Sequence, residues 1–224
     1  MTATVDRAEP DLVPDLSDPT AGRVAQAREM ASAQVQLIAD PAPLGLAAFA
    51  LTTFLLSLAN SGLMPASAEP VVFGVALAYG GVAQLLAGMW EFKKGNVFGA
   101  TVFSSYGGFW LSFWAYVTFY APGVPAEQHG AAAGWFLICW GIFTVLMFVG
   151  ALRTTLVLAA LFAVVVVAFF LLGLGALEGV TALTRAGGWV GLVAGAMAWY
   201  LCLAGVLSSL FGRPVLPNRS LVRA

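Results

Sequence analysis

Charged side chains are scarce in this sequence. Only 9% of its 224 residues are Asp, Glu, Lys or Arg, whereas charged residues make up about 25% of a soluble globular domain. Apolar residues reach 60%, above the usual share of about 45–50%. This composition excludes an ordinary soluble domain with one hydrophobic core and favours a chain that lies in a lipid bilayer.

Further absences exclude most catalytic and metal-binding chemistry. His129 is the only histidine and no apolar run contains a lysine, so neither a histidine-based metal site nor a retinal-type Schiff base is expected. The sequence has no HExxH, no GxSxG, no phosphate-binding loop and no pair of carboxylates inside an apolar run. Its two cysteines do not form a disulfide framework. We expect a protein that is not an enzyme, uses no cofactor or metal and has no nucleic-acid partner.

The sequence is rich in apolar runs of about 20 residues, the length at which a helix spans a bilayer. Short polar breaks with Gly or Pro separate them. The six runs lie at roughly 44–63, 71–91, 97–119, 131–150, 154–175 and 187–208. The predicted fold class is all-α, a polytopic bundle of six transmembrane helices in the plasma or inner membrane of the cell.

The positions of the basic residues predict the orientation of these helices. With both termini in the cytoplasm, nine of the ten Lys and Arg residues lie on the cytoplasmic side and Arg185 is the exception. The external loops then hold Glu69, Glu127, His129 and Glu178. The opposite orientation places nine positive charges outside, so we expect both termini inside.

The composition divides the chain into three parts. Residues 1–39 form a cytoplasmic tail whose acidic first 18 residues cannot bury enough apolar surface to fold. From Pro19 the apolar spacing indicates either a helix on the membrane surface or a weakly helical tail. Residues 40–210 contain the six helices. Residues 211–224 form a basic cytoplasmic tail, broken by prolines, that cannot continue the last helix.

Two prolines stand immediately before the first apolar run. The stretch reads Asp40, Pro41, Ala42, Pro43, Leu44, Gly45 and Leu46. Proline disfavours helical geometry in the residue before it, and Pro43 suits the first turn of a helix, where its missing N–H is not needed. Asp40 can accept a hydrogen bond at the helix start and interact with its dipole. A role in starting the helix fully explains the two prolines.

Polar residues share one face of the first predicted helix. Phe49, Thr53, Leu56 and Asn60 recur at spacings of four, three and four. A hydroxyl and an amide are costly in contact with lipid. We therefore expect this face to point into the protein.

The second predicted helix has a similar face. It carries Gly80, Gln84, Gly88 and Glu91. The glycines allow a close approach of another helix. Gln84 is either a hydrogen-bonded clip between helices or part of a polar path. Glu91 either pairs with Lys93, Lys94 or backbone, or handles a proton.

The third predicted helix has two distinct faces. Thr101, Ser105, Gly108 and Ser112 form a small polar one, and Tyr106, Trp110, Phe113 and Val117 form an aromatic one. Tyr106 lies too near the middle of the helix for an interfacial position, and its hydroxyl must find a partner. Taken together, the helices predict a neutral path of amide, hydroxyl and aromatic groups, which suits a small molecule or a weak acid.

Three stretches resemble a known family. DPAPLGLAAFALTT resembles the NPAPLGL signature of the GPR1/FUN34/YaaH family of acetate uptake transporters. YGGVAQLLAGMWEFKKGNVFGATVFSSYGGFW, residues 79–110, resembles that family nearly throughout. FGRPVLP, residues 211–217, resembles its C-terminal end. The similarity spans residues 40–217 and all six runs.

The resemblance implies a membrane transporter or channel for acetate and related short monocarboxylates, with succinate in some cases. It implies either proton symport or an anion channel, and a homohexamer with one path through each subunit. By motif match, the family's constriction falls on Phe49 and Tyr106, with Val165 as a looser third member. From the polar faces, the candidate substrate-binding residues are Thr53, Asn60, Gln84, Thr101 and Ser105, and Glu91 is the candidate for a proton or an ion pair.

The sequence departs from the family at two places, and two other functions stay open. Asp40 replaces the usual Asn of the signature and adds a negative charge at a possible anion mouth, and residues 1–39 are extra relative to short bacterial members. A membrane sensor could use the acidic tail as its output. An exporter of ammonium or another small cation is disfavoured, because buried acids are absent.

Overall fold

The structure is a computed structural model that describes residues 19–36 and 38–222. The chain forms two units, divided between Ala39 and Asp40. In the first unit the described helix is α1 (Pro19–Gln36), which begins at the proline where the sequence predicts a helix start. The prediction of disorder for residues 1–18 lies outside the described residues.

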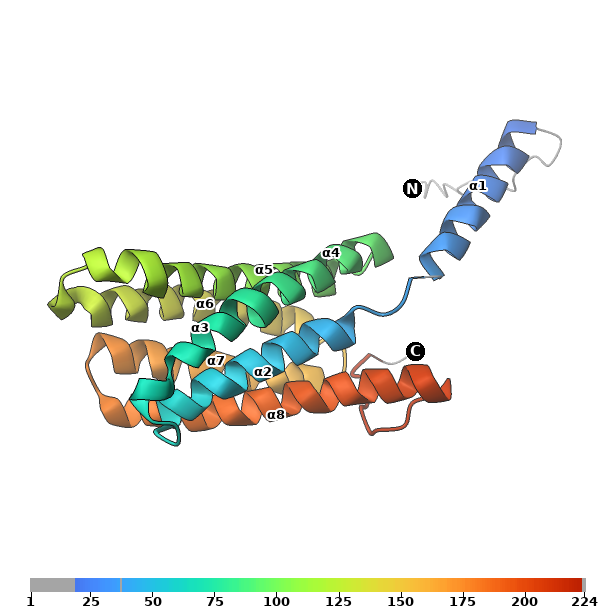
Figure 1. Cartoon of the computed structure of the whole chain (residues 1–224). Helices are drawn as coiled ribbons and strands as arrows, with labels where there is room; N and C mark the ends of the chain where they lie inside the picture. The colour runs from blue at the N-terminus through green and yellow to red at the C-terminus, as the bar shows by residue number, and fades with distance from the viewer. Residues whose placement is uncertain (1–18, 37, 223–224) are drawn as a thin grey trace, which may run out of the picture. The chain divides into compact units, whose positions relative to one another are not determined.

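The second unit is built from helices, which are labelled in Figure 1. They are α2 (Ala42–Ser61), α3 (Pro70–Val75), α4 (Gln84–Lys94), α5 (Val97–Ala115), α6 (His129–Ala151), α7 (Leu156–Leu177) and α8 (Thr181–Phe211). Two π-helical segments, η2 (Ala76–Ala83) and η3 (Tyr116–Tyr120), continue α3 and α5, and short 3-10 turns η1 (Ala66–Ala68), η4 (Ala121–Gly123) and η5 (Ala126–Gln128) lie in the loops. From residue 38 to 222 there is no β-strand, only an isolated bridge between Thr155 and Ser220.

Five helical segments are long and apolar enough to cross a membrane: Ala42–Ser61, Ala66–Lys94, Ala126–Ala151, Leu156–Leu177 and Thr181–Phe211. This supports the all-α, multi-pass fold class. The third predicted run also forms a helix, α5, but it is not among the five. Its serines and glycines lower its hydropathy, so a sixth crossing stays a prediction.

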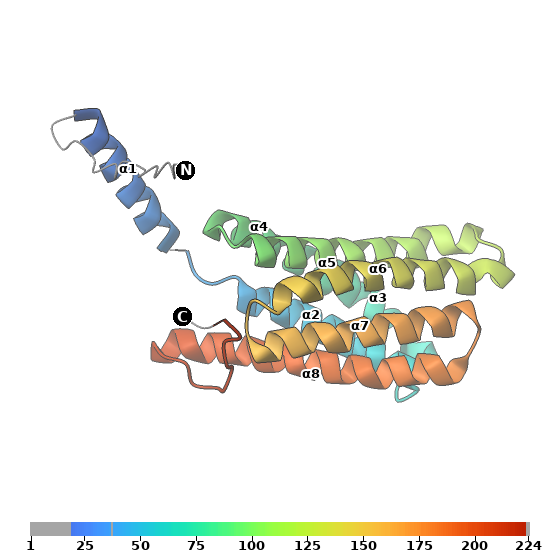
Figure 2. The same cartoon turned by 180° about the vertical axis from the view of Figure 1, so that it is seen from behind.

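The helices of the second unit pack as a ring. Helix α8 packs against α2 and α7, α7 packs against α6, and α4 with η2 packs against α5 and α2. Contacts between α5 and α6 close the ring. Figure 2 shows α6, α7 and α8 side by side from behind. The first and last long helices, α2 and α8, are thus neighbours, and the ring encloses the face of α2 that carries Phe49.

Local signals set the ends of the elements around this ring. Asp40 Oδ1 accepts a hydrogen bond from the N–H of Ala42, the first residue of α2, at 3.2 Å. Gly95 has a φ of 76° and ends α4, and Asn96 Oδ1 accepts from Gly99 N at 3.1 Å at the start of α5. The two prolines and the Gly-Asn pair therefore act as helix boundaries.

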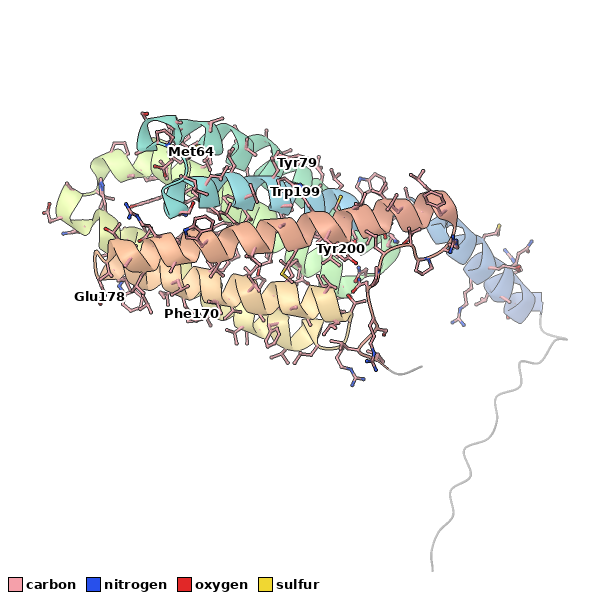
Figure 3. The ribbon with its side chains drawn as sticks, turned by 90° about the horizontal axis from the view of Figure 1, so that it is seen from below. Met64, Tyr79, Phe170, Glu178, Trp199 and Tyr200 are labelled. Atoms are coloured by element: carbon pink, nitrogen blue, oxygen red, sulfur yellow. The ribbon has the colours of Figure 1, made fainter. Side chains whose placement is uncertain are left out.

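The C-terminal tail turns back along the bundle after α8 ends at Phe211, as its prolines predict. Leu156 N donates to Arg219 O at 2.8 Å, and Leu221 N donates to Thr154 O at 2.9 Å. The Tyr200 hydroxyl of α8, which is labelled in Figure 3, donates to Pro217 O at 2.7 Å. These bonds hold the tail against the turn between α6 and α7.

Glycines bring α8 close to α2. A Cβ added at Gly188 would lie 2.7 Å from the Asn60 carbonyl carbon and 2.8 Å from Ser61 Cα, both backbone atoms of α2. Gly187, Gly191 and Gly195 likewise face Leu172, Ser57 and Phe54 of the same chain. The glycine ridge of the last run therefore serves packing within one subunit.

Gly188→Ala should lower the melting temperature of the purified protein in detergent, because α2 must shift away, and overpacking costs about 1–3 kcal/mol. Gly74→Ala on α3 is the matched control, because nothing lies within 4 Å of its added Cβ. The control should be neutral or stabilising, since Ala is favoured over Gly in a helix by about 0.5–1 kcal/mol. Equal melting temperatures for the two variants would contradict the close contact.

Candidate functional site

Two cavities follow one another along α2 inside the ring of helices. The first is lined by residues near the start of α2, by α4, α5 and α7, and by Asn96 between α4 and α5. The second is lined by the later half of α2 together with α5, α6, α7 and α8. Both linings are mostly apolar, so the few polar atoms in them stand out as sites that could hold a ligand.

Three residues line both cavities: Phe49 of α2, Tyr106 of α5 and Val165 of α7. They are the same three residues that the family resemblance assigned to a constriction. We call this set the neck. All three side chains are buried, with Phe49 9%, Tyr106 3% and Val165 6% exposed. The structure thus brings them together, from three different helices, at the place where the two cavities meet.

Aromatic rings surround the neck. The centroids of the Phe49 and Tyr106 rings are 5.9 Å apart, with the planes tilted by 56°. Tyr106 also contacts Trp140, Phe143 and Phe162, with ring centroids 6.2, 5.8 and 6.4 Å away. Its hydroxyl lies 2.8 Å from Thr144 Oγ1, so the partner that a buried tyrosine requires comes from α6.

Three of the predicted substrate-binding residues line the cavities. Gln84 lines the first, and Thr53 and Asn60 line the second. The Thr53 hydroxyl and both amide atoms of Gln84 are buried with no hydrogen-bond partner among the described residues. Gln84 therefore makes no interhelical clip to the part of the chain that the structure describes. Its amide is instead available to a ligand in the first cavity.

The other two predicted substrate-binding residues lie elsewhere. Thr101 Oγ1 donates to Val97 O of its own helix at 2.8 Å, and Thr101 lines neither cavity. Ser105 lines a separate surface hollow together with Cys139, Trp140 and Phe143. Thr101 and Ser105 of the polar face of α5 therefore lie outside both cavities, whereas Tyr106 and Trp110 of its aromatic face line them.

Glu91 is fully buried and lines the first cavity. Its Oε2 accepts a hydrogen bond from Asn96 Nδ2 at 2.8 Å, while Oε1 has no partner among the described residues. The sequence suggested Lys94 as an ion-pair partner of Glu91. In the structure Lys94 pairs with Asp40 instead, with Lys94 Nζ 3.0 Å from Asp40 Oδ1. The negative charge that Asp40 brings is thus balanced by Lys94.

The signature stretch contributes to the first cavity through its later residues. Ala42 and Leu46 line the cavity. Gly45 is needed because a Cβ there would lie 2.6 Å from the Phe103 ring. Asp40 itself is exposed and lies outside the lining. The signature therefore starts α2 and shapes the wall of the cavity.

Two polar groups near the neck are absent from the predicted site residues, although the sequence placed Trp110 on the same helix face as Tyr106. Trp110 is 2% exposed and lines the second cavity, and its Nε1–H has no partner among the described residues. Its spacing of four residues from Tyr106 was the available signal. Thr144 is fully buried and bonds Tyr106 from α6, and a lone threonine in an apolar run gave no signal. Within the described residues, no group of three or more His, Cys, Asp or Glu could hold a metal ion.

Comparison with known proteins gives consistent similarities. The model of the GPR1/FUN34/yaaH family matches residues 22–218. The succinate-acetate/proton symporter SatP of Escherichia coli (strain K12) is 42% identical over 180 residues, which cover 80% of this chain and 95% of the relative. Acetate permease A of Emericella nidulans is 43% identical over 196 residues, with 80% of this chain and 65% of the relative covered.

A solved structure and one further relative extend the comparison. The structure of the bacterial acetate channel SatP superposes with a TM-score of 0.75 at 42% identity, and it covers 80% of this chain and 98% of that chain. Ammonia transport outward protein 2 of Saccharomyces cerevisiae is 41% identical over 182 residues, with 79% of this chain and 64% of the relative covered. The family model covers most of the chain, and both curated bacterial and fungal relatives exceed 40% identity. The chain therefore belongs to the GPR1/FUN34/yaaH family.

Proposed function

We propose that this chain is a multi-pass membrane transporter or channel for acetate and related short monocarboxylates, and also for the dicarboxylate succinate, and that it is linked to protons. The observation that carries the proposal is the pair of cavities that meet at Phe49, Tyr106 and Val165. Similarity to the succinate-acetate/proton symporter and to the acetate channel supports this choice of substrate.

The neck acts as a barrier to charge. A carboxylate in water is strongly solvated, and an apolar constriction removes that solvation without replacing it. A protonated acid crosses without this cost. Thr53, Asn60 and Gln84 supply hydrogen bonds to the carboxyl group on either side of the neck. The neck therefore sets size and charge selectivity, and the cavities provide binding.

The proposed topology has six crossings, with α5 and η3 as the third. The 19 residues of α5 extend about 28 Å, close to the thickness of a bilayer core. The loops near Lys94 and Arg153 and the tail with Arg213 and Arg219 lie on the cytoplasmic side, as the distribution of positive charge favours. The protein resides in the plasma or inner membrane as a homohexamer, an arrangement that the family resemblance implies.

Uptake by vesicles that contain the purified full chain tests the proposed function. Labelled acetate should enter faster than into vesicles without protein, whereas labelled methylammonium should not. Protein-dependent uptake of methylammonium alone would favour the alternative of a small-cation exporter. One relative is named as an ammonia transport protein. Uptake of neither would favour a sensor.

Phe49→Ala should widen the neck. The flux of acetate should then rise, or the uptake of larger acids such as butyrate should increase relative to that of acetate. Phe54→Ala is the matched control. Phe54 lies on the same helix, contacts the Trp199 ring with centroids 5.0 Å apart and planes tilted by 44°, and lines neither cavity. Competition of acetate uptake by acids of increasing length measures selectivity. If Phe49→Ala and Phe54→Ala give the same selectivity as the wild type, the neck is misplaced.

Gln84→Met should weaken the apparent affinity for acetate roughly 10-fold to 150-fold, the effect of about 1.5–3 kcal/mol for one donor to a charged acceptor. Met retains the length of the side chain and removes its hydrogen bonds. Ser104→Ala is the control, since Ser104 Oγ is also buried without a partner but lines neither cavity. Concentration dependence of uptake measures the affinity. Unchanged affinity in Gln84→Met would rule out a role in binding.

Glu91→Gln should lower the rate or the stability but leave the shape of the pH profile unchanged. Most of the pH dependence should come from the substrate, since a simple carboxylic acid titrates at about pH 4–5, and uptake should rise as the external pH falls. Uptake is measured against pH with either the carboxylate or the protonated acid held at fixed concentration. Loss of pH dependence in a variant that still transports would make Glu91 the proton carrier.

A further inference from the structure

The hydrogen bond between Tyr106 and Thr144 is one of two consecutive hydrogen bonds, and the donor and acceptor in each can be assigned. Tyr106 Oη lies 2.8 Å from Thr144 Oγ1, and Thr144 Oγ1 lies 2.7 Å from the backbone carbonyl oxygen of Trp140, one turn earlier on α6. Thr144 is fully buried and Tyr106 is 3% exposed. The two hydrogen bonds run from the hydroxyl of Tyr106, a neck residue, to the Trp140 carbonyl oxygen.

The number of hydrogen atoms determines which group donates in each hydrogen bond. A hydroxyl group has one hydrogen to donate, and a carbonyl oxygen only accepts. Both bonds form together only if Thr144 donates to Trp140 and Tyr106 donates to Thr144. The Tyr106 oxygen is then left with lone pairs and no hydrogen for the path. Because Phe49 and Val165 carry no polar side-chain atom, the Tyr106 oxygen is the one polar side-chain atom among the three neck residues, and in this arrangement it can only accept a hydrogen bond.

No nearby charge disturbs this arrangement. The rings packed on Tyr106 belong to Phe49 of α2, Trp140 and Phe143 of α6, and Phe162 of α7, and all are uncharged. Apart from Tyr106 itself, Glu91 of α4 is the only titratable side chain that lines either cavity, and it belongs to the first one. The hydrogen-bonding character of the neck is therefore set by Thr144.

We propose that Thr144 is a positioning residue that keeps the neck a hydrogen-bond acceptor and thereby selects the protonated carboxylic acid over the carboxylate. The O–H of the acid donates to Tyr106 Oη as it passes. A carboxylate has only lone pairs to present to the same oxygen, so it meets repulsion as well as loss of solvation. The inference rests on the proposed transport of monocarboxylates and explains how the neck could favour one protonation state.

The test compares protein-dependent acetate uptake by vesicles at external pH 5.5 and 7.5, with the protonated acid held at one concentration. The carboxylate concentration then differs by about 100-fold. The wild type should show the same initial rate at both values. Thr144→Val removes the acceptor for the Tyr106 hydroxyl, which can then donate to a carboxylate. Such a bond favours a charged acceptor roughly 10-fold to 150-fold, so the rate of this variant should be roughly 10-fold higher at pH 7.5.

Two controls separate this effect from a structural one. Thr144→Ser retains the hydroxyl and should restore the wild-type pH profile. Thr52→Val removes an equally buried hydroxyl, which donates to Ala48 O of its own helix at 2.9 Å and lines neither cavity. This variant should also keep the wild-type profile. A pH-independent rate for Thr144→Val, or the same shift in Thr52→Val, would overturn the proposal.

Tyr106→Phe provides an independent test, which also decides the matter should Thr144→Val fail to fold. It retains the ring but removes the acceptor, so protein-dependent uptake of the protonated acid should fall roughly 2-fold to 12-fold, the effect of one neutral hydrogen bond. The uptake rate of this variant should not depend on the concentration of the carboxylate. Uptake equal to the wild type would contradict the inference. Absence of acetate uptake by the wild type would instead contradict the proposed function and the inference together.

Discussion

In the proposed transport of monocarboxylates, the cost of taking a carboxylate out of water is the constraint on which the rest of the structure depends. Three buried side chains from three helices, Phe49, Tyr106 and Val165, line both cavities, and two of the three carry no polar side-chain atom. An ion in such surroundings is unfavourable by many kcal/mol unless it is paired or neutralised. The polar groups of the path therefore stand on either side of the neck, and the one polar oxygen within it is held by α6.

The packing of the helices serves this arrangement. Glycines at α8 let it approach the backbone of α2, and Gly45 lets α2 approach Phe103 of α5. These contacts hold Phe49 within 5.9 Å of the Tyr106 ring. Asp40 and Lys94 join the start of α2 to the end of α4 by an ion pair, at the same end of these helices as Asn96 and Glu91, which line the first cavity. Small residues thus bring the helices around the cavities into close contact, and an exposed ion pair joins the start of α2 to the end of α4.

The sequence predicted much of this organisation, for identifiable reasons. Long apolar runs, the prolines before α2 and the Gly-Asn pair at 95–96 placed most helices within a few residues, because hydropathy and capping are local properties. Prediction from the sequence was wrong or incomplete where the position of a side chain depends on contacts between helices. Ser105 and Tyr106 are adjacent in sequence, and only packing decides which of them faces the cavities. Thr144 could not be identified, because its partner is 38 residues away, and the ion pair of Lys94 with Asp40 joins residues 54 positions apart.

If the neck passes the neutral acid, as proposed, transport moves no net charge with the acid, and its dependence on membrane voltage is the decisive measurement. Purified full chain is placed in vesicles, and the potential is set with a potassium gradient and an ionophore. Uptake of labelled acetate is measured after subtraction of protein-free vesicles. Each elementary charge that crosses 100 mV is worth about 2.3 kcal/mol, so an anion that crosses the full potential changes rate by up to roughly 50-fold. Passage of the neutral acid should give an initial rate that does not change with potential. A rate that falls when the vesicle interior is made negative would show that the carboxylate itself crosses the neck, and would contradict the account.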